Sequence, residues 1–240
     1  MDRDTGKELL VDGKPVTAEK TFTPEKPDGT IELEFIFDGS ALNGEVIVVF
    51  EDLYRNKKLV YSHGSLTDTE QTVYYPSVQT HVEDQTKRVQ PVENVTVVDD
   101  VMYSKLKVGE RYQLVGVLVD KKTGKNIMVD GLPVRATRLF TAEAEDGMIT
   151  MEFHFDATGL DGDVTVFEYL SLVKDIDNKN LNYYLVAEHT DLNDTEQTFV
   201  ISPVPKTGDD TPVNILFGLL LLSGLGLAYI FWKKKNMISR

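Results

Sequence analysis

A histidine, an aspartate and a glutamine recur with identical spacing at two places in the chain. The two copies are His63-Asp68-Gln71 and His189-Asp194-Gln197. Histidine and aspartate can move protons, whereas a glutamine side chain is an amide whose carbonyl carbon can be attacked. The pattern therefore predicts an electrophile with its proton-transfer partners, and the rest of the chain should supply the nucleophile.

The elements that must position these residues read as β-strands. Apolar residues alternate with polar ones over 149–155 and, at a constant offset, over 31–37, which predicts one half-buried strand in each copy. Residues 112–119 predict another strand, followed by a turn at 121–124. No helix is expected before residue 213. Short strands at this spacing predict an all-β chain of tandem Ig-like β-sandwich repeats.

The two copies differ in completeness. The second repeat spans residues 77–203, whereas the first occupies 1–76 and has no counterpart of residues 77–118. Met1 aligns with Val119, which lies within a predicted strand. We therefore expect the sequence to be a fragment of a longer surface protein.

Composition excludes several functions. The net charge of −14 argues against nucleic acid as a partner. The absence of cysteine excludes disulfides and thiol chemistry. The acidic run that starts at Asp175 matches a calcium loop poorly, because Lys179 and Asn180 stand where a ligand and a glycine are wanted. We expect no metal and no cofactor.

The C-terminal region, residues 204–240, has three parts in a fixed order. An apolar, uncharged segment at 213–232 is long enough for a transmembrane helix, and Lys233, Lys234 and Lys235 place the C-terminus in the cytoplasm. A short motif precedes it: Val204, Pro205, Lys206, Thr207 and Gly208. This arrangement resembles the cell-wall sorting signal of Gram-positive bacteria. The resemblance implies that a sortase cleaves between Thr207 and Gly208 and links the chain to peptidoglycan. Val204 replaces the usual leucine and leaves the sortase class open.

Each repeat also contains the segment that gives VaFE repeats their name, at Val49-Phe50-Glu51 and at Val166-Phe167-Glu168. The chain resembles these repeats of surface-anchored proteins, some of which are similar to Thr–Gln ester-bond domains that crosslink their first strand to their last. The resemblance implies a site in the second repeat made of Thr80, Glu168, His189, Asp194 and Gln197. It implies an incomplete site in the first repeat, made of Glu51, His63, Asp68 and Gln71.

The chemistry of an ester needs these residue types. A threonine hydroxyl is a weak nucleophile until a base such as His189 takes its proton. Two carboxyls in an apolar core share a proton, so we expect Glu168 and Asp194 to form that pair, polarise the Gln197 amide and help ammonia leave. Spacing alone does not separate Thr80 from Thr86 or Thr96 as the nucleophile. Each residue also has an ordinary structural interpretation, as a rim histidine, a turn former or a solvated strand residue.

We expect the chain to be a structural stalk segment of a cell-wall adhesin or pilus-like protein. An intramolecular ester crosslink, which forms once, should stabilise it. Such a protein is not a turnover enzyme, because its nucleophile is consumed. The alternative is a module whose loops bind a host protein or glycan without an internal crosslink; the sequence does not identify that ligand. A secreted hydrolase would need a nucleophile outside the His-Asp-Gln set, and the sequence offers none.

Overall fold

The computed structural model describes residues 1–175 and 180–203 and confirms the predicted all-β class. The described residues belong to one compact unit, Met1–Pro203. Their only helical element is the short 3-10 turn η1 (Asp84–Thr86), and no helix in this part of the chain is long and apolar enough to cross a membrane. The predicted sorting motif and transmembrane helix lie outside the described residues, as does the centre of the insert at 176–179.

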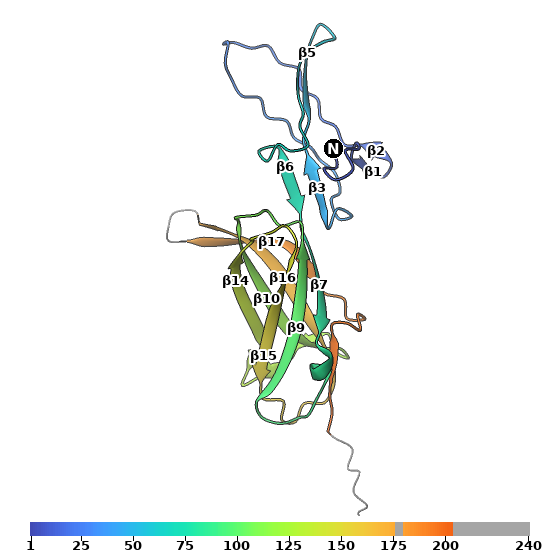
Figure 1. The fold of residues 1–240 in the computed structure, drawn as a ribbon, viewed down its shortest axis with the longest axis vertical. Helices are drawn as coiled ribbons and strands as arrows, with labels where there is room; N and C mark the ends of the chain where they lie inside the picture. The colour runs from blue at the N-terminus through green and yellow to red at the C-terminus, as the bar shows by residue number, and fades with distance from the viewer. Residues whose placement is uncertain (176–179, 204–240) are drawn as a thin grey trace, which may run out of the picture. The chain divides into compact units, whose positions relative to one another are not determined.

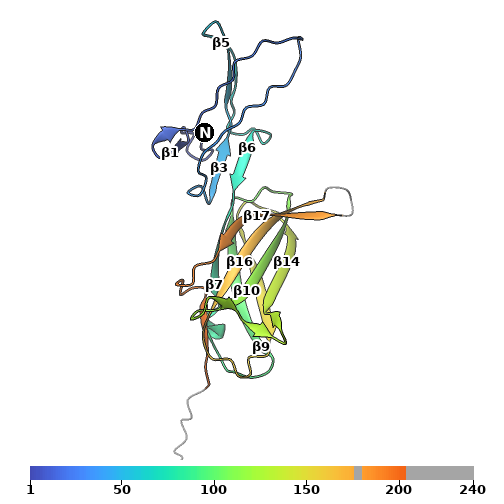
Figure 2. The ribbon, with the colours of Figure 1, turned by 180° about the vertical axis from the view of Figure 1, so that it is seen from behind.

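The second repeat is built from two facing sheets (Figure 1). The first sheet has the order β15 (Gly147–Phe155), β9 (Val95–Ser104), β7 (Ser77–Val82). The second follows the order β11-β10-β16-β18-β8, with β14 also paired to β10 and β17 to β16. Its strands are β8 (Arg88–Val89), β10 (Arg111–Asp120), β11 (Lys125–Asn126), β14 (Arg135–Thr141), β16 (Gly162–Asp175), β17 (Leu181–His189) and β18 (Thr198–Ile201). Figure 2 shows this second layer, with β10, β14 and β16, from behind.

Every second residue along each strand points inward, and these side chains fill the space between the two sheets. The inner face of β9 carries Val95, Val97, Asp99 and Val101, and that of β16 carries Val164, Val166, Glu168 and Leu170. Phe153 and Phe199 are fully buried among these residues. A carboxyl therefore replaces an apolar side chain at one inner position of each sheet, and the two residues are buried completely.

The long strand β16 pairs with two strands along one edge. Its first half pairs with β18, from Gly162 opposite Ile201 to Thr165 opposite Thr198, and its second half pairs with β17, from Glu168 opposite His189 onward. The loop that connects β17 to β18 consequently leaves and returns beside the middle of β16. This topology brings His189 and Gln197 to the same point as Glu168.

The first repeat contains part of the same arrangement of strands. Its strands are β1 (Leu10–Val11), β2 (Lys14–Pro15), β3 (Glu45–Val48), β4 (Glu51–Arg55), β5 (Lys58–His63) and β6 (Thr72–Tyr75). In the second repeat the short pair β12 (Met128–Val129) and β13 (Leu132–Pro133) corresponds to β1 and β2 at the predicted offset.

The predicted strand over residues 31–37 is wrong for the first repeat. This segment has no strand assignment, and Ile31, Leu33 and Ile36 are exposed, whereas the equivalent residues of the second repeat form β15. β15 pairs with β9, and the described part of the first repeat holds no counterpart of β9. An alternating sequence without a partner strand cannot make a ladder.

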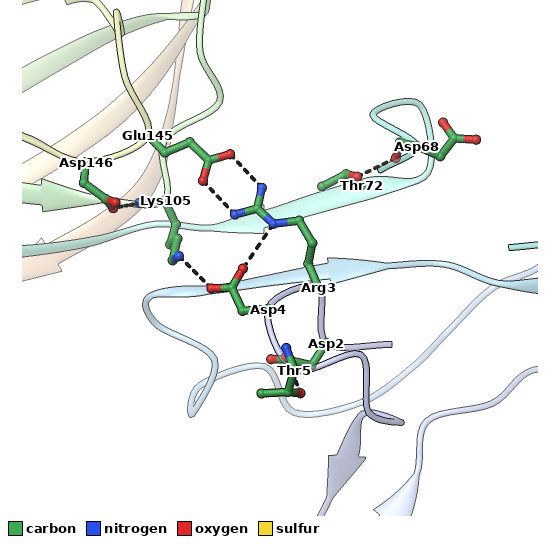
Figure 3. Close-up of polar contacts among 9 residues, drawn as sticks. All are labelled: Asp2, Arg3, Asp4, Thr5, Asp68, Thr72, Lys105, Glu145 and Asp146. Atoms are coloured by element: carbon green, nitrogen blue, oxygen red, sulfur yellow. Dashed lines mark hydrogen bonds and ion pairs between the residues drawn. The ribbon is translucent and has the colours of Figure 1, made fainter. Parts of the chain in front are cut away.

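Two ion pairs connect the repeats (Figure 3). The Arg3 guanidinium donates two hydrogen bonds of 2.6 Å to the Glu145 carboxylate, and Lys105 Nζ lies 2.7 Å from Asp4 Oδ2. Arg3 and Asp4 belong to the turn that follows Met1, while Lys105 and Glu145 lie on loops at the end of the second repeat that carries the β9–β15 ends. A bidentate contact fixes both the distance and the orientation of the guanidinium relative to the carboxylate.

Candidate active site

The candidate site lies between the sheets, where inner-face positions of three strands meet the residue that precedes a fourth. β7 supplies Thr80, β9 supplies Asp99, and β16 supplies Glu168. Gln197 directly precedes β18 and is held by a hydrogen bond of 2.9 Å from the Val166 amide to its backbone oxygen. All four side chains are buried, with Thr80 3% exposed and the other three fully covered.

The Gln197 amide nitrogen is oriented by two acceptors. It donates to Glu168 Oε2 at 2.9 Å and to the backbone oxygen of His189 at 3.1 Å. Both bonds use the nitrogen, so the carbonyl oxygen is left without a partner in the described structure. The Glu168 carboxyl therefore contacts the amide nitrogen, which an ester-forming reaction would release as ammonia, and not the carbonyl oxygen.

The carboxyls of Glu168 and Asp99 form a buried pair. Burial raises the pKa of Glu168 well above its usual range, and the Asp99 carboxyl raises it further, while Gln197 and the Thr80 hydroxyl act in the opposite direction. Burial raises the pKa of Asp99 to about 6, although Glu168 lowers it. Two like charges cannot both persist in an apolar core. The arrangement therefore holds a proton on Glu168.

His189 is oriented by Asp194. The His189 Nε2 atom lies 3.2 Å from Asp194 Oδ2, and Nδ1 is buried without a partner. Donation from Nε2 to the carboxylate fixes the tautomer that leaves a lone pair on Nδ1. The Asp194 carboxylate also accepts a bond of 2.8 Å from the Glu196 amide, and Thr198 Oγ1 donates to the Asp194 backbone oxygen at 2.6 Å. The loop thus fixes the position of its own aspartate.

The site concentrates buried polar atoms that lack partners. In the second repeat they are Thr80 Oγ1, both Asp99 carboxyl oxygens, Glu168 Oε1, His189 Nδ1 and Gln197 Oε1. Folded proteins satisfy nearly all buried polar atoms, so each exception calls for an explanation. A hydroxyl, an imidazole nitrogen, an amide oxygen and a carboxyl pair are the groups that a nucleophile, a base, an electrophile and an acid pair would need.

The structure separates the three candidate threonines. Thr80 points into the buried cluster, whereas Thr86 Oγ1 donates to the Glu83 backbone oxygen at 3.0 Å and Thr96 is exposed, with its hydroxyl 2.9 Å from His154 Nδ1. Thr80, Glu168, His189 and Gln197 are thus brought together, and Asp194 adjoins them through His189.

The expected pairing of Glu168 with Asp194 is corrected by the structure. Asp194 contacts His189, and Asp99, which sequence reasoning missed, stands beside Glu168. A signal was present, because Asp99 occupies an inward position in the run Val95, Val97, Asp99, Val101. A carboxylate at the buried parity of a valine-rich strand indicates a functional group or a mispredicted face.

An open cavity of about 380 Å³ adjoins the site. Thr80, His189 and Asp194 line it together with Gln79, His81, Met102 and Glu196. The cavity therefore reaches the side of the site formed by Thr80 and His189, whereas Glu168 and Gln197 do not line it. No group of side chains that could hold a metal ion occurs among the described residues.

The first repeat reproduces half of this geometry. Gln71 Nε2 donates to Glu51 Oε2 at 2.7 Å, and His63 Nε2 lies 3.2 Å from Asp68 Oδ2. Glu51 and His63 are exposed, however, whereas Glu168 is fully buried. Gln71 is half-buried, but no counterpart of β7 or β9 covers Glu51 and His63 in the described part of the repeat, so the site lacks a threonine strand and two of its residues face solvent.

The chain is similar to known proteins in sequence and in fold. A family model for the T-Q ester bond containing domain matches residues 1–75 and again residues 76–201. A bacterial adhesin from Mobiluncus mulieris, which contains intramolecular disulfide, isopeptide and ester bond cross-links, is structurally similar in two crystal forms. In space group P21 the identity is 16% and the TM-score 0.45; in P1 they are 15% and 0.41. No curated protein matches the sequence.

The extent of these matches differs. Each adhesin alignment covers 54% of this chain and 58% of the other, so the chain spans little more than half of that protein. The family model, by contrast, accounts for both repeats and contains every residue of the two sites. The chain belongs to the T-Q ester bond domain family.

Proposed function

We propose that this chain is a stalk segment of a sortase-anchored surface protein, and that its second repeat closes an ester between Thr80 and Gln197. The cluster of unpartnered buried atoms at Thr80, His189, Gln197 and the Asp99–Glu168 pair is the observation that supports it. Membership of the T-Q family supports the same reaction.

The proposed reaction uses the groups that the site brings together. His189 Nδ1 takes the proton of Thr80 Oγ1 as that oxygen attacks the Gln197 side-chain carbonyl carbon. Glu168, which contacts the Gln197 nitrogen at 2.9 Å, gives its proton to that nitrogen as the carbon–nitrogen bond breaks. The products are one ester and one ammonia. The proton on His189 then restores the acid pair, and the threonine is consumed, so the domain is not a turnover enzyme.

Intact mass measurement tests this proposal. The chain should weigh one ammonia less than its sequence predicts, with Thr80 joined to Gln197 in peptide mapping. Thr80→Ala and Gln197→Ala should each restore the full mass. Thr96→Ala removes an exposed hydroxyl outside the site and should keep the loss. A folded wild-type chain of unmodified mass would refute the ester.

The same measurement separates the two repeats. We expect one ammonia loss and not two, because the Gln71 site is open to solvent and lacks a threonine strand. A second loss that disappears in Gln71→Ala would contradict this assignment of the first repeat.

Anchoring rests on residues 204–240, outside the described structure. We expect cleavage after Thr207 and linkage to peptidoglycan when an exported version is expressed in a sortase-bearing cell. Thr207→Ala with Gly208→Ala should keep the protein in the membrane fraction. Equal recovery of that variant from muramidase-released wall would contradict the sorting assignment.

One observation favours a ligand-binding role as the second candidate. The β16–β17 ribbon bears exposed apolar side chains at Leu181, Tyr183, Tyr184 and Leu185. Exposed aromatic groups on a surface protein suit contact with a host protein or glycan. Replacing Tyr183 and Tyr184 by serine should abolish adhesion to host cells if this ribbon binds, and leave the crosslink intact.

A further inference from the structure

Three polar side chains on the molecular surface, those of Glu196, His81 and Lys87, connect the segments that carry the two reacting residues. Glu196 Oε2 lies 2.6 Å from His81 Nδ1 and 3.1 Å from Lys87 Nζ. His81 follows the nucleophile Thr80 on β7, and Glu196 precedes the electrophile Gln197. The contact therefore joins the immediate neighbours of the two atoms that are expected to bond.

A backbone bond reinforces this connection. The Val82 amide donates to the Glu196 backbone oxygen at 2.9 Å. β7 belongs to the three-stranded sheet, whereas Gln197 leads into β18 of the other sheet. The Glu196 residue thus links the two layers of the sandwich at the edge where the ester must cross from one to the other.

We propose that Glu196, His81 and Lys87 form a clasp that positions Thr80 against Gln197 before the bond closes, an inference that rests on the proposed ester. The three residues are positioning residues, because none of them touches the reacting atoms. His81 and Glu196 also line the open cavity that leads to Thr80 and His189.

A contact that positions the reacting groups affects the reaction rate, whereas one that only stabilises the fold affects the free energy of unfolding. The clasp is exposed, and exposed ion pairs contribute little to the free energy of unfolding. Attack on a carbonyl carbon is far more sensitive to geometry, because a displacement of about 1 Å can cost roughly 100-fold in rate. Loss of the clasp should therefore change the rate of crosslinking much more than the stability of the fold.

The test follows crosslinking and folding separately in the full chain. The chain is recovered unreacted from inclusion bodies in guanidinium and refolded by dilution. Acid-quenched samples are weighed to obtain the rate of ammonia loss, and far-ultraviolet circular dichroism gives the rate of folding. We expect Glu196→Ala to slow ammonia loss about tenfold with the folding rate and the final mass unchanged.

Graded and matched variants complete the experiment. Glu196→Gln keeps an acceptor for His81 and should slow the reaction less than Glu196→Ala. His81→Ala and Glu196→Ala should not be additive when combined, because they remove the same contact. Glu152→Gln is the control, because Glu152 makes a similar exposed pair with His154, 3.2 Å apart, away from the site.

The outcomes separate this inference from the proposed function. Wild-type rates of ammonia loss in both Glu196 variants would overturn the clasp and leave the ester standing. A parallel fall in folding and crosslinking rates would also overturn it, because the residues would then act through the fold. If the wild-type chain itself never lost ammonia, the ester and the clasp would both be wrong.

Discussion

Asp99 and Glu168 compete for a proton in a buried space, and their unequal surroundings decide where it resides. Burial raises the pKa of Glu168 most, and the charge of the neighbouring Asp99 raises it further. The pKa of Asp99 rises only to about 6, so at neutral pH Asp99 is the charged member. A neutral Glu168 can give its proton to the departing nitrogen, and Asp99 keeps it neutral.

Removal of the Asp99 charge should therefore slow the reaction. In Asp99→Asn burial still raises the pKa of Glu168, but the contribution of the Asp99 charge is gone, so Glu168 holds its proton less firmly and ammonia loss should slow, by up to roughly 100-fold. Timed intact masses after refolding measure this effect. Asp100→Asn is the control, because Asp100 lies on the outer face of the same strand, where Thr150 donates to it at 2.7 Å. Equal rates in the two variants would remove Asp99 from the mechanism.

The same pair predicts a pH dependence of stability. An acid whose pKa is raised by folding binds its proton more tightly in the folded chain, so its contribution is complete below the unfolded pKa near 4 and is lost as pH rises through the folded value. For Asp99 that window ends at about 6. In Thr80→Ala, which cannot crosslink, the free energy of unfolding should therefore fall relative to Thr80→Ala with Asp99→Asn as the pH rises from 4 to 7.

Urea denaturation of both variants at each pH measures this difference. It should be on the order of 3 kcal/mol between the ends of the range. Other carboxyls, such as Asp4 and Asp120, have lowered pKa values and act in the opposite direction. They are common to both variants, so they cancel in the comparison. Parallel curves for the two proteins would contradict the raised pKa of Asp99.

Sequence alone could predict the residue types of the site but not all of its contacts. His189, Asp194 and Gln197 lie close together in the sequence, and the short connection between β17 and β18 keeps them close together in the fold. The partner of Glu168 could not be assigned, because Asp99 reaches it only after β9 and β16 face each other across the core. Residues that meet across two facing sheets have no fixed separation along the sequence, so no sequence pattern identifies such a pair.

At the scale of elements, packing around the middle of β16 depends on a glycine, a residue without a side chain, in the neighbouring strand β10. Gly116 pairs with Glu168 across these strands, and a Cβ atom at Gly116 would lie 2.5 Å from Phe153 Cζ. The glycine therefore lets Phe153 fill the core directly beside Glu168. Phe153 is fully buried and cannot move aside into solvent.

A side chain at this glycine should disturb both packing and chemistry. Gly116→Ala should destabilise the second repeat by about 1–3 kcal/mol through overpacking, and it should slow ammonia loss by displacing Glu168. Thermal unfolding and timed intact masses measure the two effects. Gly29→Ala is the matched control, because a Cβ atom there meets nothing within 4 Å. A wild-type crosslinking rate in Gly116→Ala would show that the site tolerates the shift.

Strands were predictable where a partner strand is also present. The alternation over 149–155 and the apolar run over 112–119 correspond to β15 and β10. The same alternation over 31–37 forms no strand, since a ladder requires hydrogen bonds from a second segment. Periodicity identifies the face of a strand, but pairing depends on which other segments the fold supplies.

At the scale of the molecule, the proposed ester changes how the chain transmits force. The ester would join β7, the strand that enters the second repeat, to Gln197, which leads into its last strand. Tension between the first repeat and residue 203 would then pass through a covalent bond a few residues from each end. Closing this loop would also remove unfolded-chain entropy worth about 4–5 kcal/mol if an ester behaves as a disulfide does.

Single-molecule pulling of the whole chain tests this path. In the wild-type protein the segment between Thr80 and Gln197 should never extend, because the ester bears the load in place of the hydrogen bonds between strands. In Thr80→Ala the same segment should unfold under force and lengthen the chain by roughly 40 nm, near the contour length of the released residues. Thr96→Ala should behave as the wild type. A 40 nm step in the wild type, in molecules whose mass shows the ammonia loss, would place the crosslink elsewhere in the chain.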